Sequence, residues 1–387
     1  MASSQNVASS RRRSHPRLPD AAKEGTEIMS SARHPISGPF VWTGDDLAAS
    51  GRWIRAFTSD EIERIDRAIS AYRRSGRGWR EANRDTLPLE GFEALFDDVA
   101  DELENGLGLF RLRGVPVERH DHEALKAFYL SFGDHLGTPV SQNLEGDRIN
   151  AIEDEGAKSN DYGIIDDRAT GGGFRSSRAR AFSSAGLRFH CDRCDVVGLL
   201  CVRQAKIGGH SMIASAVAIH NAMLERRPDL LEELFTDYPR SRFGEEVNDA
   251  SAHYMLPVFT SKNGKFATHY SRTYVEAAQT NPDVPRLRPE QDEALDLLAE
   301  LAGELCFEMT LQPGDIQLLN NHVMYHARED FQDDASTGQR RLLFRLWLAM
   351  PNSRALHESF AVLFGNTDPG TVRGGIWPPE RAYRLPL

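Results

Sequence analysis

Apolar residues recur at helical spacing in the first third of the chain and again near residue 300. Ile62, Ile65 and Ile69 lie three or four positions apart and follow Thr58-Ser59-Asp60-Glu61, which has the form of a capping box. This pattern predicts a helix directly after the box. Similar patterns predict further helices over residues 92–103, 122–137 and 289–305.

From residue 137 onward the pattern changes to short apolar or alternating runs that are separated by turn residues. Asn263-Gly264 lies between two such runs, which is a strong signal for a β-hairpin. Gly208-Gly209 and Gln312-Pro313-Gly314-Asp315 mark further turns. The strands predicted in this way cover residues 108–114, 196–202, 211–213, 306–311, 316–320 and 341–350. Many strands around one helical excursion predict a mainly β fold with flanking α-helices, as in a sandwich or jelly roll.

The same pattern suggests how the chain is divided. Pro16, Pro19 and Pro35 lie in a stretch without apolar periodicity, so residues 1–38 are predicted to form a flexible leader and residues 39–387 a single domain. Within that domain we expect N-terminal helices (58–136), a β core (about 137–351) with an insertion (155–186) and a helical excursion (215–305), and a C-terminal extension (352–387).

The insertion from residue 155 to 186 is rich in Gly, Ser, Asp and Arg and leads directly into the segment 187–193. A long irregular insertion in a compact domain is usually a lid or a disordered surface loop. Two interpretations are open: a mobile lid in which Arg175, Arg178, Arg180 and Arg188 contact an anionic substrate, and a surface loop in which these arginines are solvated.

The composition of the chain limits the kinds of partner that it is expected to bind. The net charge is −11, whereas binding to nucleic acid needs clustered Lys and Arg. The chain has no apolar run long enough for a membrane helix and no apolar signal-peptide region. Four cysteines do not make a disulfide scaffold, and Cys191-x-x-Cys194 has no second pair to complete a zinc site. We therefore expect a cytoplasmic protein that binds a small molecule, neither nucleic acid nor membrane, with homo-oligomer formation left open.

His190-Cys191-Asp192 is a candidate for metal binding. On a strand over residues 187–193, the side chains of His190 and Asp192 would share one face and could converge on one ion. A His from a distant strand would complete a 2-His-1-carboxylate triad, which suits non-haem Fe(II) oxygenases because it leaves coordination positions open. A chain this rich in His and acidic residues is expected to contain such a triplet by chance, so the motif alone is weak.

The segment 341–350 alternates with the period of a strand. One face carries two arginines and the other is wholly apolar; the first face comprises Arg341, Leu343, Arg345, Trp347 and Ala349. These arginines lie either in water or inside a β-barrel, where each guanidinium would need an anion. Arg binds a carboxylate through two parallel hydrogen bonds, so the second arrangement would suit a dicarboxylate.

The order of these motifs resembles the taurine dioxygenase (TauD/TfdA) family of Fe(II)- and 2-oxoglutarate-dependent oxygenases. The resemblance covers about residues 137–351 and implies a double-stranded β-helix (jelly-roll) core. Its elements are His190-x-Asp192, then Gly208-Gly209-His210-Ser211, then Asn320-Asn321 to His326, and finally Arg341 to Arg345. The chain departs from the family pattern at His210, where an acidic residue is usual, and at Cys191, where Thr is common.

The resemblance also implies residue roles. His190, Asp192 and His326 look like the iron ligands, with no catalytic residue beyond them. Ser211 and Arg341 would bind the distal carboxylate of 2-oxoglutarate, and Arg345 would lie near its other end or near the substrate. His322 competes with His326 as the third ligand, and the family spacing to the Arg favours His326. Asn143, Arg188 and His322 are candidate substrate contacts.

The implied function is oxidation of a small molecule with Fe(II), O2 and the cosubstrate 2-oxoglutarate, which is converted to succinate and CO2. An amino acid, another carboxylate or a natural-product intermediate fits as substrate, and hydroxylation, desaturation and cyclisation all fit as outcome. The alternatives are a metal-dependent hydrolase with the same ligands and a catalytically inactive β-barrel that serves as a binding module.

Overall fold

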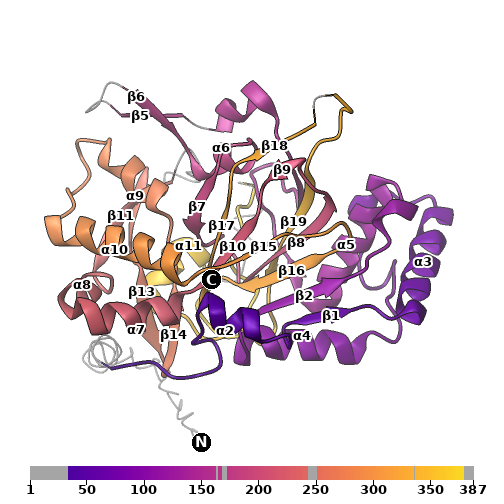
Figure 1. The fold of residues 1–387 in the computed structure, drawn as a ribbon, viewed down its shortest axis with the longest axis horizontal. Coiled ribbons are helices and arrows are strands. Elements are labelled where there is room, and N and C mark those ends of the chain that lie inside the picture. The colour runs from indigo at the N-terminus through magenta and orange to yellow at the C-terminus, as the bar shows by residue number, and fades with distance from the viewer. Residues whose placement is uncertain (1–33, 163, 168–171, 243–250, 335, 379–387) are drawn as a thin grey trace, which may run out of the picture.

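The computed structural model describes residues 34–162, 164–167, 172–242, 251–334 and 336–378. Nearly all of the predicted leader, part of the insertion and the end of the predicted C-terminal extension lie outside these ranges. Figure 1 shows a β core with one group of helices at each end. Within the described residues no helix is both long and apolar enough to cross a membrane.

The helices largely follow the sequence prediction. Thr58 caps the helix of residues 59–74, because its side chain accepts a hydrogen bond from Glu61 N and the Glu61 side chain accepts one from Thr58 N. Ser215 caps a second helix in the same way through Ala218 N. The α-helices are α2 Gly44–Ala49, α3 Ser59–Arg74, α4 Glu93–Asn105, α5 His122–Leu136, α6 Ser177–Ala181, α7 Ala216–Arg226, α8 Pro228–Glu233, α9 Arg272–Gln279, α10 Pro289–Leu305 and α11 Ala361–Phe364.

The larger of the two main sheets follows the order β1-β2-β16-β8-β19-β3, and β4 also pairs with β19. β1 and β2 are parallel, and the other pairs are antiparallel. The strands of this sheet are β1 Ile54–Ala56, β2 Leu109–Arg113, β3 Thr138–Pro139, β4 Ile149–Ile152, β8 Val196–Arg203, β16 Ile316–Asn320 and β19 Leu342–Ala349.

The smaller main sheet is antiparallel and follows the order β15-β10-β17-β7. Its strands are β7 Leu187–His190, β10 Ser211–Ser215, β15 Phe307–Met309 and β17 Met324–Arg328. Four two-stranded sheets accompany it, formed by β5 Ile164–Asp167 with β6 Gly172–Arg175, β9 Ile207–Gly208 with β18 Phe331–Gln332, β11 Asp237–Ser241 with β12 His253–Pro257, and β13 Phe259–Lys262 with β14 Lys265–Thr268.

The alternation of β19 explains how the core is layered. Leu343 and Trp347 belong to the apolar cluster inside the β core, which also contains Ile213 of the smaller sheet. Phe344 and Leu346 point the other way, into the cluster formed with helices α3, α4 and α5. The arginine-bearing face of β19 therefore lies inside the β core, and the jelly-roll architecture with flanking helices is confirmed (Figure 1).

The helical excursion lies at the opposite end of the core from α3, α4 and α5 (Figure 1). The predicted hairpin within it is β13–β14, whose turn has positive φ at Asn263 (53°) and Gly264 (73°), as a type I′ turn requires. The helix predicted over residues 289–305 is α10.

Three local predictions differ from the structure. The strand predicted over 187–193 ends at His190, so Asp192 lies in the loop that follows. The insertion is not wholly irregular, because its described part contains the β5–β6 pair and α6. Finally, β17 carries His326 but was not predicted as a strand; all five of its residues are buried, so it shows no alternation.

Candidate active site

Two neighbouring strands bring His190 and His326 together. His190 of β7 pairs directly with His326 of β17, so both side chains lie on the same face of the smaller sheet. Their ring centroids are 4.1 Å apart. Burial is the main cause that lowers the pKa of both imidazoles, that of His326 to about 3. Neutral imidazole is the form that binds metal ions.

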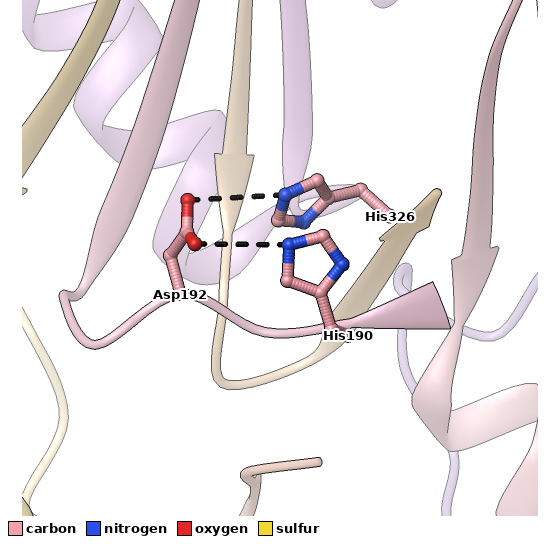
Figure 2. Close-up of side chains that lie close together, drawn as sticks. All are labelled: His190, Asp192 and His326. Carbon is pink, nitrogen blue, oxygen red and sulfur yellow. Dashed lines mark ion pairs between the residues drawn. The ribbon is translucent and has the colours of Figure 1, made fainter. Parts of the chain in front are cut away.

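Asp192 completes the cluster (Figure 2). Its Oδ1 lies 3.7 Å from His190 Nε2, and its Oδ2 lies 3.8 Å from His326 Nε2. One potential ligand atom from each residue lies within 4.8 Å of the other two, and all three residues are buried. Two imidazole nitrogens and a carboxylate oxygen in this arrangement form a site that fits a divalent metal ion.

The Asp192 carboxylate is oriented by contacts outside its own loop. Trp347 Nε1 donates a hydrogen bond to Oδ2 (2.9 Å), and Arg345 Nη1 lies 3.5 Å from Oδ1. Burial alone would raise the pKa of Asp192, but the positive charge of Arg345 and the hydrogen bond from Trp347 act in the opposite direction, and the pKa is lowered overall. The carboxylate is therefore ionised, as a metal ligand must be.

The ring orientation of His190 is also set by the backbone. Its Nδ1 lies 2.9 Å from the carbonyl oxygen of Arg188 and donates to it, which leaves Nε2 directed at Asp192 without a proton. For His326, no partner of Nδ1 is found among the described residues, although this atom is buried.

A second set of polar side chains outside the metal cluster is also buried. Ser211 of β10 donates a hydrogen bond to Gln317 Oε1 of β16 (3.1 Å) and thereby links the two main sheets. Gln317 Nε2 and Arg341 Nη1 are both buried, and neither has a hydrogen-bond partner in the described part of the chain. Burial lowers the pKa of Arg341 to about 10. Unsatisfied buried donors are costly, so this region suits an acceptor-rich anion such as a carboxylate.

The metal cluster lies at the wall of a cavity. His190, Asp192 and Arg345 line it together with Gln142, which accepts a hydrogen bond from Arg345 Nε (2.8 Å). Further lining residues are Arg178 of α6, Arg193, Arg242, Tyr254, His269 and Trp347. Arg341, which directly precedes β19, is absent from this wall of described residues, so the two predicted arginines have different surroundings.

Three predicted substrate contacts are engaged elsewhere, and none lines the described cavity. Asn143 stabilises a turn, because its amide bonds both the backbone nitrogen and the carboxylate of Asp147. Arg188 points out of β7 and pairs with Glu276 (2.5 Å). The structure therefore does not support these two predictions.

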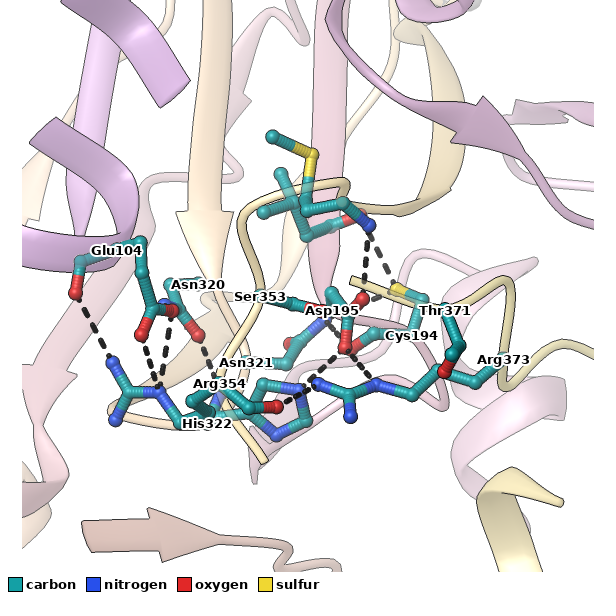
Figure 3. A network of polar contacts seen from close by, with 12 residues as sticks. Glu104, Cys194, Asp195, Asn320, Asn321, His322, Ser353, Arg354, Thr371 and Arg373 are labelled. Carbon is teal, nitrogen blue, oxygen red and sulfur yellow. Dashed lines mark hydrogen bonds and ion pairs between the residues drawn. The ribbon is translucent and has the colours of Figure 1, made fainter. Parts of the chain in front are cut away.

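His322 belongs to a buried polar network rather than to the metal cluster (Figure 3). Its Nε2 lies 2.7 Å from Asp195 Oδ1, which also accepts a hydrogen bond from Arg373 Nε (2.8 Å). The neighbouring Asn321 accepts a hydrogen bond from Asp192 N (3.2 Å) and donates to Cys194 O (3.2 Å). The network thus joins the C-terminal segment to the loop that carries Asp192.

Several residues of the site were not predicted. Trp347 shares the face of Arg345 on β19, so the alternation of that strand already indicated where its side chain points. Gln142, Gln317 and His269 carry no local signal of this kind. Their positions depend on which distant segments pack together, and the periodicity of the sequence does not predict that packing.

Comparison with known proteins agrees with this geometry. Residues 72–347 match the model of the family described as "Taurine catabolism dioxygenase TauD, TfdA family". FR-33289 synthase of Streptomyces rubellomurinus is 31% identical over 352 residues, which cover 86% of this chain and 96% of that protein. Taurine hydroxylase-like protein SAT17 of Stachybotrys chartarum is 24% identical over 318 residues and covers 80% of this chain and 79% of its own.

Solved structures show the same fold. Asparagine oxygenase in complex with Fe(II), 3-hydroxyasparagine and succinate superposes with a TM-score of 0.58 and 16% identity, over 77% of this chain and 94% of that chain. The non-haem iron oxygenase OrfP with Fe and α-ketoglutaric acid gives a TM-score of 0.54 and 15% identity, over 76% and 94%. The chain therefore belongs to the TauD/TfdA family and is a non-haem iron oxygenase that uses Fe(II), 2-oxoglutarate and O2.

Proposed function

We propose that this enzyme oxidises a small organic molecule, an amino acid or another carboxylate or a natural-product intermediate, at an iron held by His190, Asp192 and His326. The observation that carries the proposal is the buried cluster of these three side chains at the wall of the cavity. Bound Fe(II) with 2-oxoglutarate supplies O2 activation, and 2-oxoglutarate leaves as succinate and CO2.

The chain's own residues position the reactants. Arg341 and Ser211 bind the distal carboxylate of 2-oxoglutarate, for which the unpartnered Arg341 Nη1 and Gln317 Nε2 supply donors. Arg345 stacks on Trp347 at 4.9 Å and bonds Gln142, so its guanidinium is held rigidly between Asp192 and the cavity. The solved neighbours support an amino-acid substrate, because they carry hydroxyasparagine and hydroxy-L-Arg.

The test compares two histidines of similar burial. His326→Ala is expected to remove stoichiometric Fe(II) binding and 2-oxoglutarate-dependent succinate release, because a metal site with two ligands binds weakly. His322→Ala is expected to keep most of the iron and to lower only the melting temperature, because His322 bonds Asp195 rather than the metal cluster. Iron content, measured by a chromogenic chelator, checks both.

The opposite result, loss of iron in the His322 variant and retention in the His326 variant, would contradict the ligand assignment. Substrate conversion that needs the metal but neither 2-oxoglutarate nor O2, and that releases no succinate, would contradict the proposed reaction; a metal-dependent hydrolase would show that behaviour.

A further inference from the structure

Arg240 of β11 is a buried cation without a buried anion beside it. It is fully inaccessible to solvent, and its guanidinium bonds only uncharged groups. Nη1 lies 2.8 Å from His269 Nδ1, and Nη2 donates to the carbonyl oxygens of Leu256 (3.3 Å), Pro257 (3.2 Å) and His269 (2.8 Å). Among the described residues, no carboxylate forms an ion pair with it. A buried charge of this kind is expensive unless something compensates for it.

The contact with Arg240 determines which ring nitrogen of His269 carries the proton. A guanidinium only donates hydrogen bonds, so Nδ1 of His269 must accept and carries no proton. In the neutral ring the proton is then on Nε2. Burial, reinforced by the charge of Arg240, lowers the pKa of His269 well below its usual value, so the ring is neutral. His269 is therefore a fixed donor at Nε2.

This donor lies at the wall of the active-site cavity. His269 lines the cavity that also contains His190 and Asp192, and the next residue, Tyr270, accepts a hydrogen bond from Cys191 N (2.8 Å) between those two ligands. No described residue accepts a hydrogen bond from His269 Nε2.

Positively charged side chains outnumber carboxylates in the described lining of the cavity. Arg178, Arg193, Arg242 and Arg345 line it, whereas Asp192 is the single carboxylate among its described lining residues. Asp192 is assigned to the metal. The cavity wall is therefore electropositive even before Arg240, behind His269, is considered.

We infer that His269 is a substrate-binding residue that donates its Nε2 proton to an oxygen of an anionic group on the substrate, with Arg240 holding the imidazole in this tautomer and contributing the compensating positive charge. The inference rests on the proposed function, because it treats the cavity beside the metal cluster as the substrate site. It adds that the substrate carries an oxyanion, a carboxylate or a phosphate-like group, and names the residue that binds it.

The first test is the tautomer itself. In the full-length chain with Zn(II) as a diamagnetic ion, long-range ¹H–¹⁵N NMR of labelled histidine reports which ring nitrogen is protonated, and the signal that is lost in His269→Gln identifies His269. We expect an Nε2–H tautomer, which changes to a mixture in Arg240→Met because Met cannot donate to Nδ1. An Nδ1–H tautomer in the unmodified chain would overturn the inference.

The second test uses small anions as probes. Titration with sodium acetate or with inorganic phosphate is expected to shift the His269 Nε2 proton resonance with saturation, and the tighter of the two indicates a carboxylate or a phosphate-like group. Shifts from neither anion would overturn the inference. If wild-type enzyme with iron and 2-oxoglutarate releases no succinate, the proposed function fails, but these two tests of His269 remain valid.

The third test uses turnover once a substrate is found by succinate release. His269→Phe removes the donor and is expected to raise KM for that substrate roughly tenfold or more. His269→Gln, whose amide can both accept from Arg240 and donate, is expected to recover part of this loss. His253→Gln, which alters a histidine outside the cavity lining, is the control and should leave KM unchanged. Equal KM values in the Phe variant and the wild type, with both proteins folded by melting temperature, would overturn the role.

Discussion

At the scale of single residues, Arg341 is a buried cation that forms no ion pair with any described side chain. It is buried, its guanidinium lies 5.2 Å from the Phe331 ring centre, and its Nη1 has no partner in the described residues. We predict that Arg341→Ala raises KM for 2-oxoglutarate roughly tenfold or more, because a hydrogen bond to a charged group contributes about 1.5–3 kcal/mol. Ser211→Ala should have a smaller effect in the same direction.

Arg203 provides the control for this measurement. It lies at the end of β8 next to β19, and its Nε donates to the carbonyl oxygen of Arg340 rather than to a group inside the core. Arg203→Ala should leave KM for 2-oxoglutarate unchanged. If Arg341→Ala also leaves it unchanged, Arg341 does not bind the cosubstrate.

The candidate metal ligands could be predicted from the sequence, whereas the residues that contact the substrate could not. His190, Asp192 and His326 could be chosen because their residue types and chain order carry the information, and the structure brings them together. Asn143 and Arg188 were chosen by position alone, and each has another partner instead, Asp147 for Asn143 and Glu276 for Arg188. A residue's nearest polar partner depends on tertiary packing, which no motif records.

At the scale of elements, the turn between β9 and β10 links backbone conformation to the cosubstrate site. Gly209 has a φ of 74°, and a Cβ at this position would lie 3.2 Å from Arg341 Nε and 3.2 Å from Phe331 Cβ. We predict that Gly209→Ala raises KM for 2-oxoglutarate several-fold, because the added methyl displaces Arg341. It should also cost roughly 1–2 kcal/mol of unfolding free energy, as for any residue with a side chain in this region of φ.

Gly264 gives a matched comparison for this prediction. Its φ is 73°, but a Cβ there would have no heavy atom within 4 Å apart from those of Gly264 itself and its two neighbours in the chain. Gly264→Ala should therefore show the same kind of cost in urea denaturation with an unchanged KM for 2-oxoglutarate. An equal rise of KM in both variants would mean that the effect comes from general destabilisation and not from contact with Arg341.

Alternation identified β19, whereas β17 was missed because it shows no alternation. The alternation of residues 341–350 indicated both the apolar outer face of β19 and the inward position of Arg345; Arg341, directly before the strand, is also buried. β17 has no exposed residue and so no period, although it carries His326. β7 was predicted too long, because Asp192 is held by Trp347 and Asn321 from other segments rather than by strand geometry.

At the scale of the whole molecule, a buried ionic network ties the C-terminal segment to the metal-binding loop (Figure 3). The side chains of Arg373 and Asp195 are 0% and 2% exposed. We predict that Arg373→Ala lowers the free energy of unfolding by about 3–5 kcal/mol, because it leaves the Asp195 carboxylate buried without its cation. The urea midpoint and the iron affinity should both fall.

An exposed ion pair serves as the reference for that prediction. The side chains of Arg226 and Glu304 are 45% and 46% exposed, and solvent screens their attraction. Arg226→Ala should leave the urea midpoint and the iron affinity close to those of the wild type. A comparable loss of stability in both variants would show that the buried Arg373–Asp195 pair stabilises the fold no more than an exposed ion pair does.

The overall architecture was predictable to the level of a jelly roll with outer helices, but its strand order was not. β8 pairs with β16 and β19, which come from a much later part of the chain. Residues 204–315 lie between β8 and β16. Pairing over such separations depends on which buried strand surfaces fit together. The sequence pattern predicts which face of a strand is apolar, but it does not predict which other strand lies beside it.

The pairing of β7 with β17 has a consequence for how the enzyme matures. Because His190 and His326 become neighbours only when these two distant segments meet, the unfolded chain has no preformed metal site. Iron that binds only the folded chain stabilises it. When free iron is well above its dissociation constant, the added free energy of unfolding grows with the logarithm of the ratio of these two concentrations. In a cell short of iron, a larger share of newly made chains would populate open forms that proteases can cleave, so the supply of the metal would set enzyme abundance as well as activity.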